Sequence, residues 1–182
     1  MSRPEIMHPT PIDHVLALVI ALIYPLYWKV TWHRRGRAQL GEDTAVRIGV
    51  YREVMRTEWF LAALVAACWF LSERSASFLG LGLPGGWPFG VGVLVFVAYV
   101  VLGVRQIAGL RTSPDARAKI RGQLHGDVSL LIPRTLPERR VFAALSLTAG
   151  ICEEIAYRGF MLWYLATLLP VAAAVAVSAV IF

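Results

Sequence analysis

Long apolar runs separated by polar, basic stretches set the pattern of this chain. The first run, residues 15–28 (VLALVIALIYPLYW), is uncharged and extends to Trp32, so it is long enough to cross a bilayer as a helix of about 20 residues. Pro25 is expected to kink that helix. Two tryptophans and a lysine close to its end are typical of a membrane interface.

Two further runs predict a second and a third span. The stretch EWFLAALVAACWFL is short by itself, but it suffices if the helix begins near Val54 and if Arg56 and Glu58 reach the surface. The segment FLGLGLPGGWPFG is too rich in glycine and proline for a helix, so the third span is expected to begin near Phe89.

The fourth predicted helix runs from Val141 to about Leu169, and Pro170 ends it. Residues 171–182 begin a fifth apolar segment of 12 residues, which is too short to cross a bilayer. We therefore predict an all-α fold, a polytopic transmembrane helix bundle with about four spans and a partial fifth. Residues 1–182 are expected to form a single integral membrane domain, the N-terminal portion of a larger one.

Composition supports a membrane protein. Hydrophobic residues make up 57% of the chain and charged residues only 16%, whereas soluble domains carry about 25% charge. The net charge of +6 does not indicate nucleic-acid binding, because the arginines lie in two blocks between apolar runs rather than on one exposed face. The predicted partner is the lipid bilayer, and the first apolar run is not followed by a cleavage motif of a signal peptide.

The basic residues predict the orientation. Residues 29–58 hold seven lysines and arginines and residues 105–140 hold eight, whereas residues 72–88 hold only Arg74 and the N-terminus only Arg3. Cytoplasmic loops carry the excess of such residues. We therefore expect loops 33–53 and 111–140 in the cytoplasm and the N-terminus outside, in a bacterial inner (plasma) membrane.

Three ionisable residues interrupt the fourth helix, in the stretch GICEEIAYRGF (150–160). Glu154 and Arg158 stand at i and i+4, on one face of a helix, so they can pair. Glu153 points about a quarter turn away and is left free to face a cavity. Because each such residue costs about 2.5 to 3.5 kcal/mol at the centre of a membrane helix, the group indicates a function.

This stretch resembles the Glu-Glu-x-x-x-Arg signature of the CPBP intramembrane protease family, which includes CAAX prenyl endopeptidases and bacteriocin-processing or bacteriocin-immunity proteins. The segments FLGLGLP and LIPRTLPERRVFAALSLTAG are also similar to the family, so the resemblance covers about residues 78–182. It implies an intramembrane endopeptidase in which Glu153 activates the water that hydrolyses a bond of a peptide or protein substrate. Glu154 and Arg158 would orient the helix and set the local charge.

The family's other signatures are Phe-x-x-x-His and a later histidine, and Phe182 stands where the phenylalanine of the former is expected. Neither histidine occurs in the sequence, so we expect the 182-residue chain alone to lack peptidase activity. Zinc is a cofactor that the resemblance alone implies, since family members have been described both as metalloproteases and as glutamate-dependent proteases.

Two other classes of protein fit the same residues. One is a non-catalytic membrane scaffold or bacteriocin-immunity-like protein, and the other is a transporter fragment, since membrane carboxylates also serve proton relays. The remaining candidate residues favour structural roles: solvated histidines, small buried cysteines and hydroxyl groups that pack between helices. They are His8, His14, His33, His125, Cys68, Cys152, Ser146 and Thr148.

Overall fold

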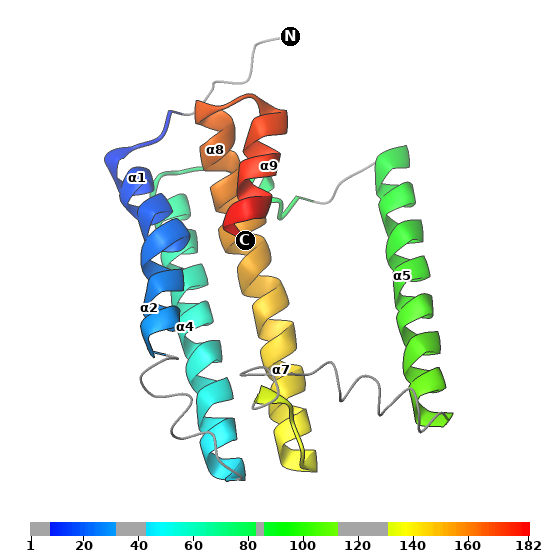
Figure 1. The fold of residues 1–182 in the computed structure, drawn as a ribbon. Helices are drawn as coiled ribbons and strands as arrows, with labels where there is room; N and C mark the ends of the chain where they lie inside the picture. The colour runs from blue at the N-terminus through cyan, green and yellow to red at the C-terminus, as the bar shows by residue number, and fades with distance from the viewer. Residues whose placement is uncertain (1–7, 32–42, 83–85, 113–130) are drawn as a thin grey trace. The chain divides into compact units, whose positions relative to one another are not determined.

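The computed structural model describes residues 8–31, 43–82, 86–112 and 131–182 (Figure 1). All regular structure in this part of the chain is helical, which confirms the predicted fold class. The chain divides into two compact units, one made of Met1–Gly82 with Pro133–Phe182 and the other of Leu83–Ile132. The second unit contains α5 (Trp87–Thr112), in which Phe89–Gln106 is long and apolar enough to cross a membrane.

The first unit begins with a continuous helix that changes geometry in the middle. It consists of α1 (Pro11–Leu18), the π-helical turn η1 (Val19–Ile23) and α2 (Tyr24–Thr31). The irregular turn lies just before Pro25, whose ring would clash with the carbonyl four residues earlier in an α-helix. In η1 the backbone N–H of Tyr24 donates to Val19 five residues back. The irregularity expected at Pro25 thus takes the form of a π turn.

Helix α4 (Thr44–Leu71) is longer than the sequence predicted. It begins after Asp43, whose side chain accepts a hydrogen bond from the backbone of Ala45 at 2.8 Å. The predicted start near Val54 is therefore wrong, because this cap starts the helix earlier and nothing between breaks it. Glu58 consequently lies in the middle of α4 and is only 9% exposed, so its predicted route to the surface is also wrong.

A second continuous helix carries the Glu-Glu stretch. It consists of α7 (Leu136–Glu153), the π-helical η5 (Glu154–Met161) and α8 (Leu162–Leu168), close to the predicted span of 141–169. Thr135 and Glu138 form a capping box at its start. After Pro170, α9 (Val171–Ile181) turns back along α8 and η5 (Figure 1).

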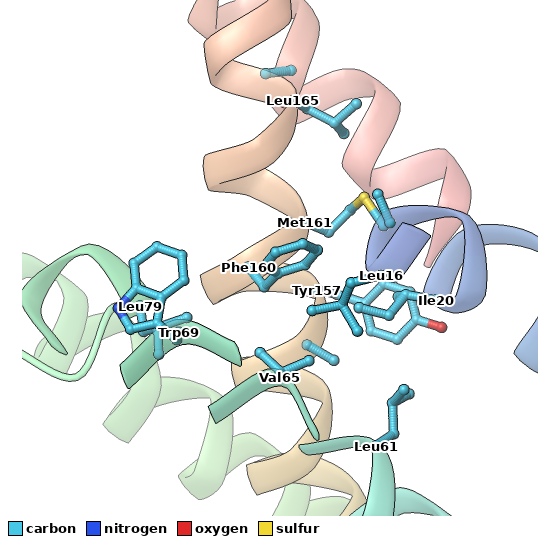
Figure 2. Close-up of a cluster of buried hydrophobic side chains, with 13 residues drawn as sticks. Leu16, Ile20, Leu61, Val65, Trp69, Leu79, Tyr157, Phe160, Met161 and Leu165 are labelled. Carbon is cyan, nitrogen blue, oxygen red and sulfur yellow. The ribbon is translucent and has the colours of Figure 1, made fainter. Parts of the chain in front are cut away.

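Buried side chains from several helices of the first unit form its hydrophobic core (Figure 2). The first helix contributes Leu16 and Ile20, α4 contributes Val65 and Trp69, and η5 contributes Phe160 among others. The short 3-10 helix η3 (Ala76–Leu79) follows α4 and adds Leu79. The core therefore joins the first helix and α4 to the second half of the Glu-Glu helix.

Two buried arginine–carboxylate pairs link helices at opposite ends of this unit, and the sequence analysis predicted neither. Arg74, just after α4, donates to both carboxylate oxygens of Asp13 in α1, at 2.7 and 2.6 Å. Arg47, in the first turns of α4, donates through Nε and Nη2 to one oxygen of Glu138 in α7, at 3.1 and 3.0 Å. Helices α4 and α7 therefore begin at the same end, and α1 begins at the other.

Three helices of the described residues are long and apolar enough to cross a membrane: Pro11–Thr31, Thr44–Leu71 and Phe89–Gln106. These are the first three predicted spans. The helix that carries the Glu-Glu stretch is not in this set, and its crossing stays a prediction. Helix α9 has 11 residues, fewer than the about 20 that a span needs, as expected for the fifth apolar segment.

Candidate active site

The two neighbouring glutamates face different surroundings. Arg158 Nη1 donates to Glu154 Oε1 at 2.5 Å, which confirms the predicted i, i+4 pair. The side chains of Arg158 and Glu154 are 74% and 55% exposed. Both side chains lie at the surface of the first unit. Glu153 is half-buried and lies on another face.

Glu153 lines a small cavity of about 70 Å³ inside the first unit. Helices α2, α4, α7 and η5 and the last residue contribute its walls. The lining residues are Tyr24, Glu58, Leu61, Cys152, Glu153, Ala156, Tyr157 and Phe182. Since a water molecule needs roughly 10 to 15 Å³ of such volume, the cavity has room for several waters beside the carboxyl group.

Glu58 is the second carboxyl group of this cavity and was missed in the sequence analysis. Glu58 is 9% exposed, and its Oε2 atom is buried without a hydrogen-bond partner in the described structure. The signal was present in the sequence, since an acid within a predicted membrane span is costly and usually functional. It was assigned to the surface because the start of α4 was set too late.

The π-helical geometry of η5 coincides with the Glu-Glu stretch. The backbone N–H of Leu162 donates to the carbonyl of Tyr157 five residues back, as in a π turn. Both Glu153 and Tyr157, four residues apart, line the cavity. Single π turns inside α-helices are rare overall, and those that occur are often found at functional sites.

Gly159 fits a close approach between η5 and the segment after α4. A Cβ atom built at this position would lie 2.7 Å from the backbone carbonyl oxygen of Leu79, closer than real Cβ contacts. A glycine is therefore required where the two segments meet. This explains the glycine that follows Arg158 in the sequence and ties the cavity-bearing turn to η3.

A larger cavity of about 330 Å³ lies beside the small one. Tyr157 and Phe182 line both cavities, and their rings pack edge to face with centroids 5.4 Å apart. The other lining residues come from η5, α8 and α9 and are mostly apolar: Arg158, Leu162, Val175, Ser178 and Ala179. An apolar volume with a single arginine thus adjoins the polar one.

Of the remaining candidate residues, Cys152 lines the cavity beside Glu153. His14 is exposed, and its Nδ1 lies 2.7 Å from the hydroxyl of Tyr164, so it has a partner besides solvent. Ser146 donates to the carbonyl of Phe142 at 3.0 Å within its own helix. Neither lines the cavity. The other residues of this set are exposed His8, half-buried Cys68, buried Thr148 and Cys152, and His33 and His125, which lie outside the described residues.

The described residues do not fit a zinc ion. Within residues 8–31, 43–82, 86–112 and 131–182, no group of three or more histidine, cysteine, aspartate or glutamate side chains is arranged to hold a metal ion. A catalytic zinc needs about three such ligands. Zinc therefore stays an expectation from the resemblance, and no step below depends on it.

A family of known proteins matches the part of the chain that contains this site. Residues 137–182 match the family described as Type II CAAX prenyl endopeptidase Rce1-like. The match agrees with the resemblance to the CPBP family that the Glu-Glu stretch indicated, and it covers α7, η5, α8 and α9. No curated protein and no solved structure matches the chain.

Proposed function

We propose that this chain carries the glutamate part of an intramembrane endopeptidase site of the CAAX-protease type. The observation that carries the proposal is the division between the adjacent acids. Glu153 faces a cavity with room for water, whereas Glu154 is bound by Arg158 on another face of the helix. The family match over residues 137–182 supports a peptide or protein as the substrate.

In the proposed mechanism Glu153 is the general base. It accepts a proton from a water in the small cavity while the oxygen of that water attacks the carbonyl carbon of the scissile amide. Glu154 and Arg158 neutralise each other, so the pair leaves Glu153 as the carboxylate of the stretch that faces the cavity. The adjoining cavity of about 330 Å³ would hold an apolar part of the substrate, with Arg158 beside it.

The arrangement of helix ends supports the proposed orientation. Because Arg47 binds Glu138, the basic N-terminal ends of α4 and α7 lie together, as the two basic loops would if both faced the cytoplasm. Helix α5, between them in sequence, is apolar and long enough for the return crossing. The N-terminus would then lie outside, in a bacterial inner membrane.

The test is cleavage of a peptide in liposomes by three proteins. These are the 182-residue chain, a version extended through whatever the gene encodes after Phe182, and that version with Glu153→Gln. We expect turnover by the extended protein and its loss, by about 10² to 10⁴-fold or more, in the variant, because a glutamine keeps the shape and cannot accept the proton. Glu53→Gln, on α4 and outside the cavity lining, is the matched control.

Two outcomes would contradict the proposal. Undiminished turnover with Glu153→Gln would show that another group is the base. Robust turnover by the 182-residue chain would show that the later signatures are not needed for the reaction. Equal loss in the Glu53→Gln control would indicate a general effect on folding rather than on chemistry.

A further inference from the structure

Three acids are buried in the described structure: Asp13, Glu58 and Glu138. Glu58 differs from the other two. Asp13 and Glu138 each bind a buried arginine, whereas no ion pair of Glu58 occurs among the described residues and its Oε2 has no hydrogen-bond partner. An ionised carboxylate buried in this way costs several kcal/mol. The fold must compensate Glu58 by other means than an arginine.

The cavity offers no cation for this purpose. Its polar lining groups are the carboxyls of Glu58 on α4 and Glu153 on α7, the hydroxyls of Tyr24 and Tyr157, and the thiol of Cys152. Among the described residues that line it, none is a lysine, an arginine or a histidine. Phenols and thiols ordinarily carry their protons at neutral pH, so they add no charge. Two carboxylates beside one small cavity would therefore repel each other without relief.

One proton removes both costs. If the two carboxyl groups hold a single proton between them, the like-charge repulsion disappears and one of the two acids is buried in neutral form. Glu58 is the better site for that proton, because it is 9% exposed whereas Glu153 is only half-buried. Shared protons of this kind give paired carboxylates distinct acid and base roles.

We propose that Glu58 is a further catalytic residue, which holds the proton of a Glu58–Glu153 pair and delivers it to the leaving nitrogen of the substrate. The catalytic part rests on the proposed endopeptidase function, whereas the sharing of one proton does not. Its basis is the common cavity of the two acids and the burial of Glu58 with its Oε2 atom lacking a hydrogen-bond partner in the described structure.

The proton transfers balance without any other reactant. Glu153 takes one proton from water as the remaining hydroxyl forms a bond to the carbonyl carbon. The carbon–nitrogen bond breaks as the acid proton of Glu58 moves to the amide nitrogen, which leaves as an amine. Glu153 is then protonated and Glu58 ionised, and transfer of the proton across the cavity restores the starting pair.

Infrared spectroscopy of the purified 182-residue protein tests the shared proton without any need for activity. At neutral pH we expect a carboxylic-acid C=O band equivalent to one protonated group per chain. Glu58→Gln should remove this band, because Glu153 alone, half-buried, ionises. Glu153→Gln and the control Glu53→Gln should retain it. Absence of the band from the unaltered protein, or its persistence in Glu58→Gln, overturns the proposal. The measurement on the unaltered protein does not depend on whether any variant folds.

A protein that cleaves peptide tests the catalytic role. Glu58→Gln should lower kcat by about 10² to 10⁴-fold with little change in KM, because the lost interaction acts during bond breaking. Since an acid must be protonated to act, this variant should also lose the fall of activity at high pH. An unchanged kcat in Glu58→Gln overturns the catalytic role of Glu58 but does not affect the proposed endopeptidase function. No cleavage by the extended protein, with the band intact, overturns the proposed function and leaves the shared proton.

Discussion

Acids at the two ends of the first unit are held by arginines, whereas the acids in the middle of α4 and of the Glu-Glu helix share a cavity without one. At the ends, Asp13 and Glu138 are fully paired and buried, so they fix the positions of helix termini. In the middle, Glu58 and Glu153 are left with water-sized space. Acidic side chains thus hold helices together where a buried arginine pairs with them. Where the described residues provide no such arginine, the acids remain available for proton transfer.

The end near Asp13 offers the largest test of this comparison. Arg74 binds both oxygens of Asp13, and its guanidinium lies 5.2 and 4.5 Å from the ring centroids of Trp69 and Trp163. Arg74→Met leaves a buried carboxylate unpaired, so the free energy of unfolding should fall by about 3 to 5 kcal/mol. Denaturant titration in detergent micelles measures it.

Two matched variants make that test specific. Arg52→Met, at an exposed position of α4, should change the free energy of unfolding by less than about 0.5 kcal/mol. Adding Asp13→Asn to Arg74→Met should recover part of the loss, because the stranded charge is removed. A loss that is no greater for Arg74→Met than for Arg52→Met would show that the ends are not held by this pair.

The packing that holds the middle of the unit is the second test. Gly159→Ala would place a methyl group 2.7 Å from the carbonyl oxygen of Leu79, so the unfolding free energy should fall by about 1 to 3 kcal/mol. Gly150→Ala, on the same continuous helix and with nothing within 4 Å of its Cβ, should instead be neutral or stabilise by up to about 1 kcal/mol. Equal effects would mean that η5 does not approach Leu79 closely.

The exposed pair on η5 should contribute less than the pairs at the ends. A double-mutant cycle with Glu154→Gln and Arg158→Gln is expected to give a coupling energy of about 0.2 to 1 kcal/mol if water surrounds the pair, since the side chains are 55% and 74% exposed on the surface of the unit. The four proteins of the cycle are compared by the same denaturant titration. A coupling of about 3 kcal/mol or more would contradict the exposure and make this pair equivalent to the buried ones.

The last test concerns the pH dependence of Glu138, which lies before the predicted membrane span. Burial by itself raises the pKa of Glu138, but hydrogen bonds from the backbone of Arg134 and the side chain of Arg47 lower this pKa from 4.5 to about 2. Since the pKa is depressed in the folded protein, its contribution to stability is present above pH 4.5 and lost as the pH falls towards 2.

Melting temperatures between neutral and acid pH measure this contribution. The protein should melt at progressively lower temperature below pH 4.5, and Glu138→Gln should make the curve flatter in that interval while melting at lower temperature at neutral pH. Glu73→Gln, at an exposed position, serves as the control and should follow the unaltered protein. If Glu138→Gln does not change the slope of melting temperature against pH, other groups are responsible for the acid sensitivity.

Local spacing predicted much of the Glu-Glu helix but none of its long-range partners. The i, i+4 rule gave the pair of Glu154 and Arg158, and the quarter turn between adjacent residues placed Glu153 on a different face. Both follow from helix geometry alone. The end of the helix was also close, because Pro170 stops it, whereas its start at Leu136 lies before the predicted Val141, with Pro137 in its first turn.

The buried pairs and Glu58 could not be predicted in the same way. Arg74 and Asp13 are 61 residues apart, and Arg47 and Glu138 are 91 apart, so no helical period relates them. Their pairing depends on which helix ends meet in the folded unit. The role of Glu58 was lost through an error in one helix start, since hydropathy locates the apolar part of a helix and not its polar extension.

The π-helical run Glu154–Met161 has a consequence for comparing this chain with its relatives. A π turn spaces its hydrogen-bonded residues one position further apart than an α turn does. A relative with an uninterrupted α-helix would therefore need one residue fewer between Glu153 and Leu165 to present the same faces to the core. A correct alignment of two such chains contains a one-residue gap inside a helix, where substitution patterns alone argue most strongly against a gap.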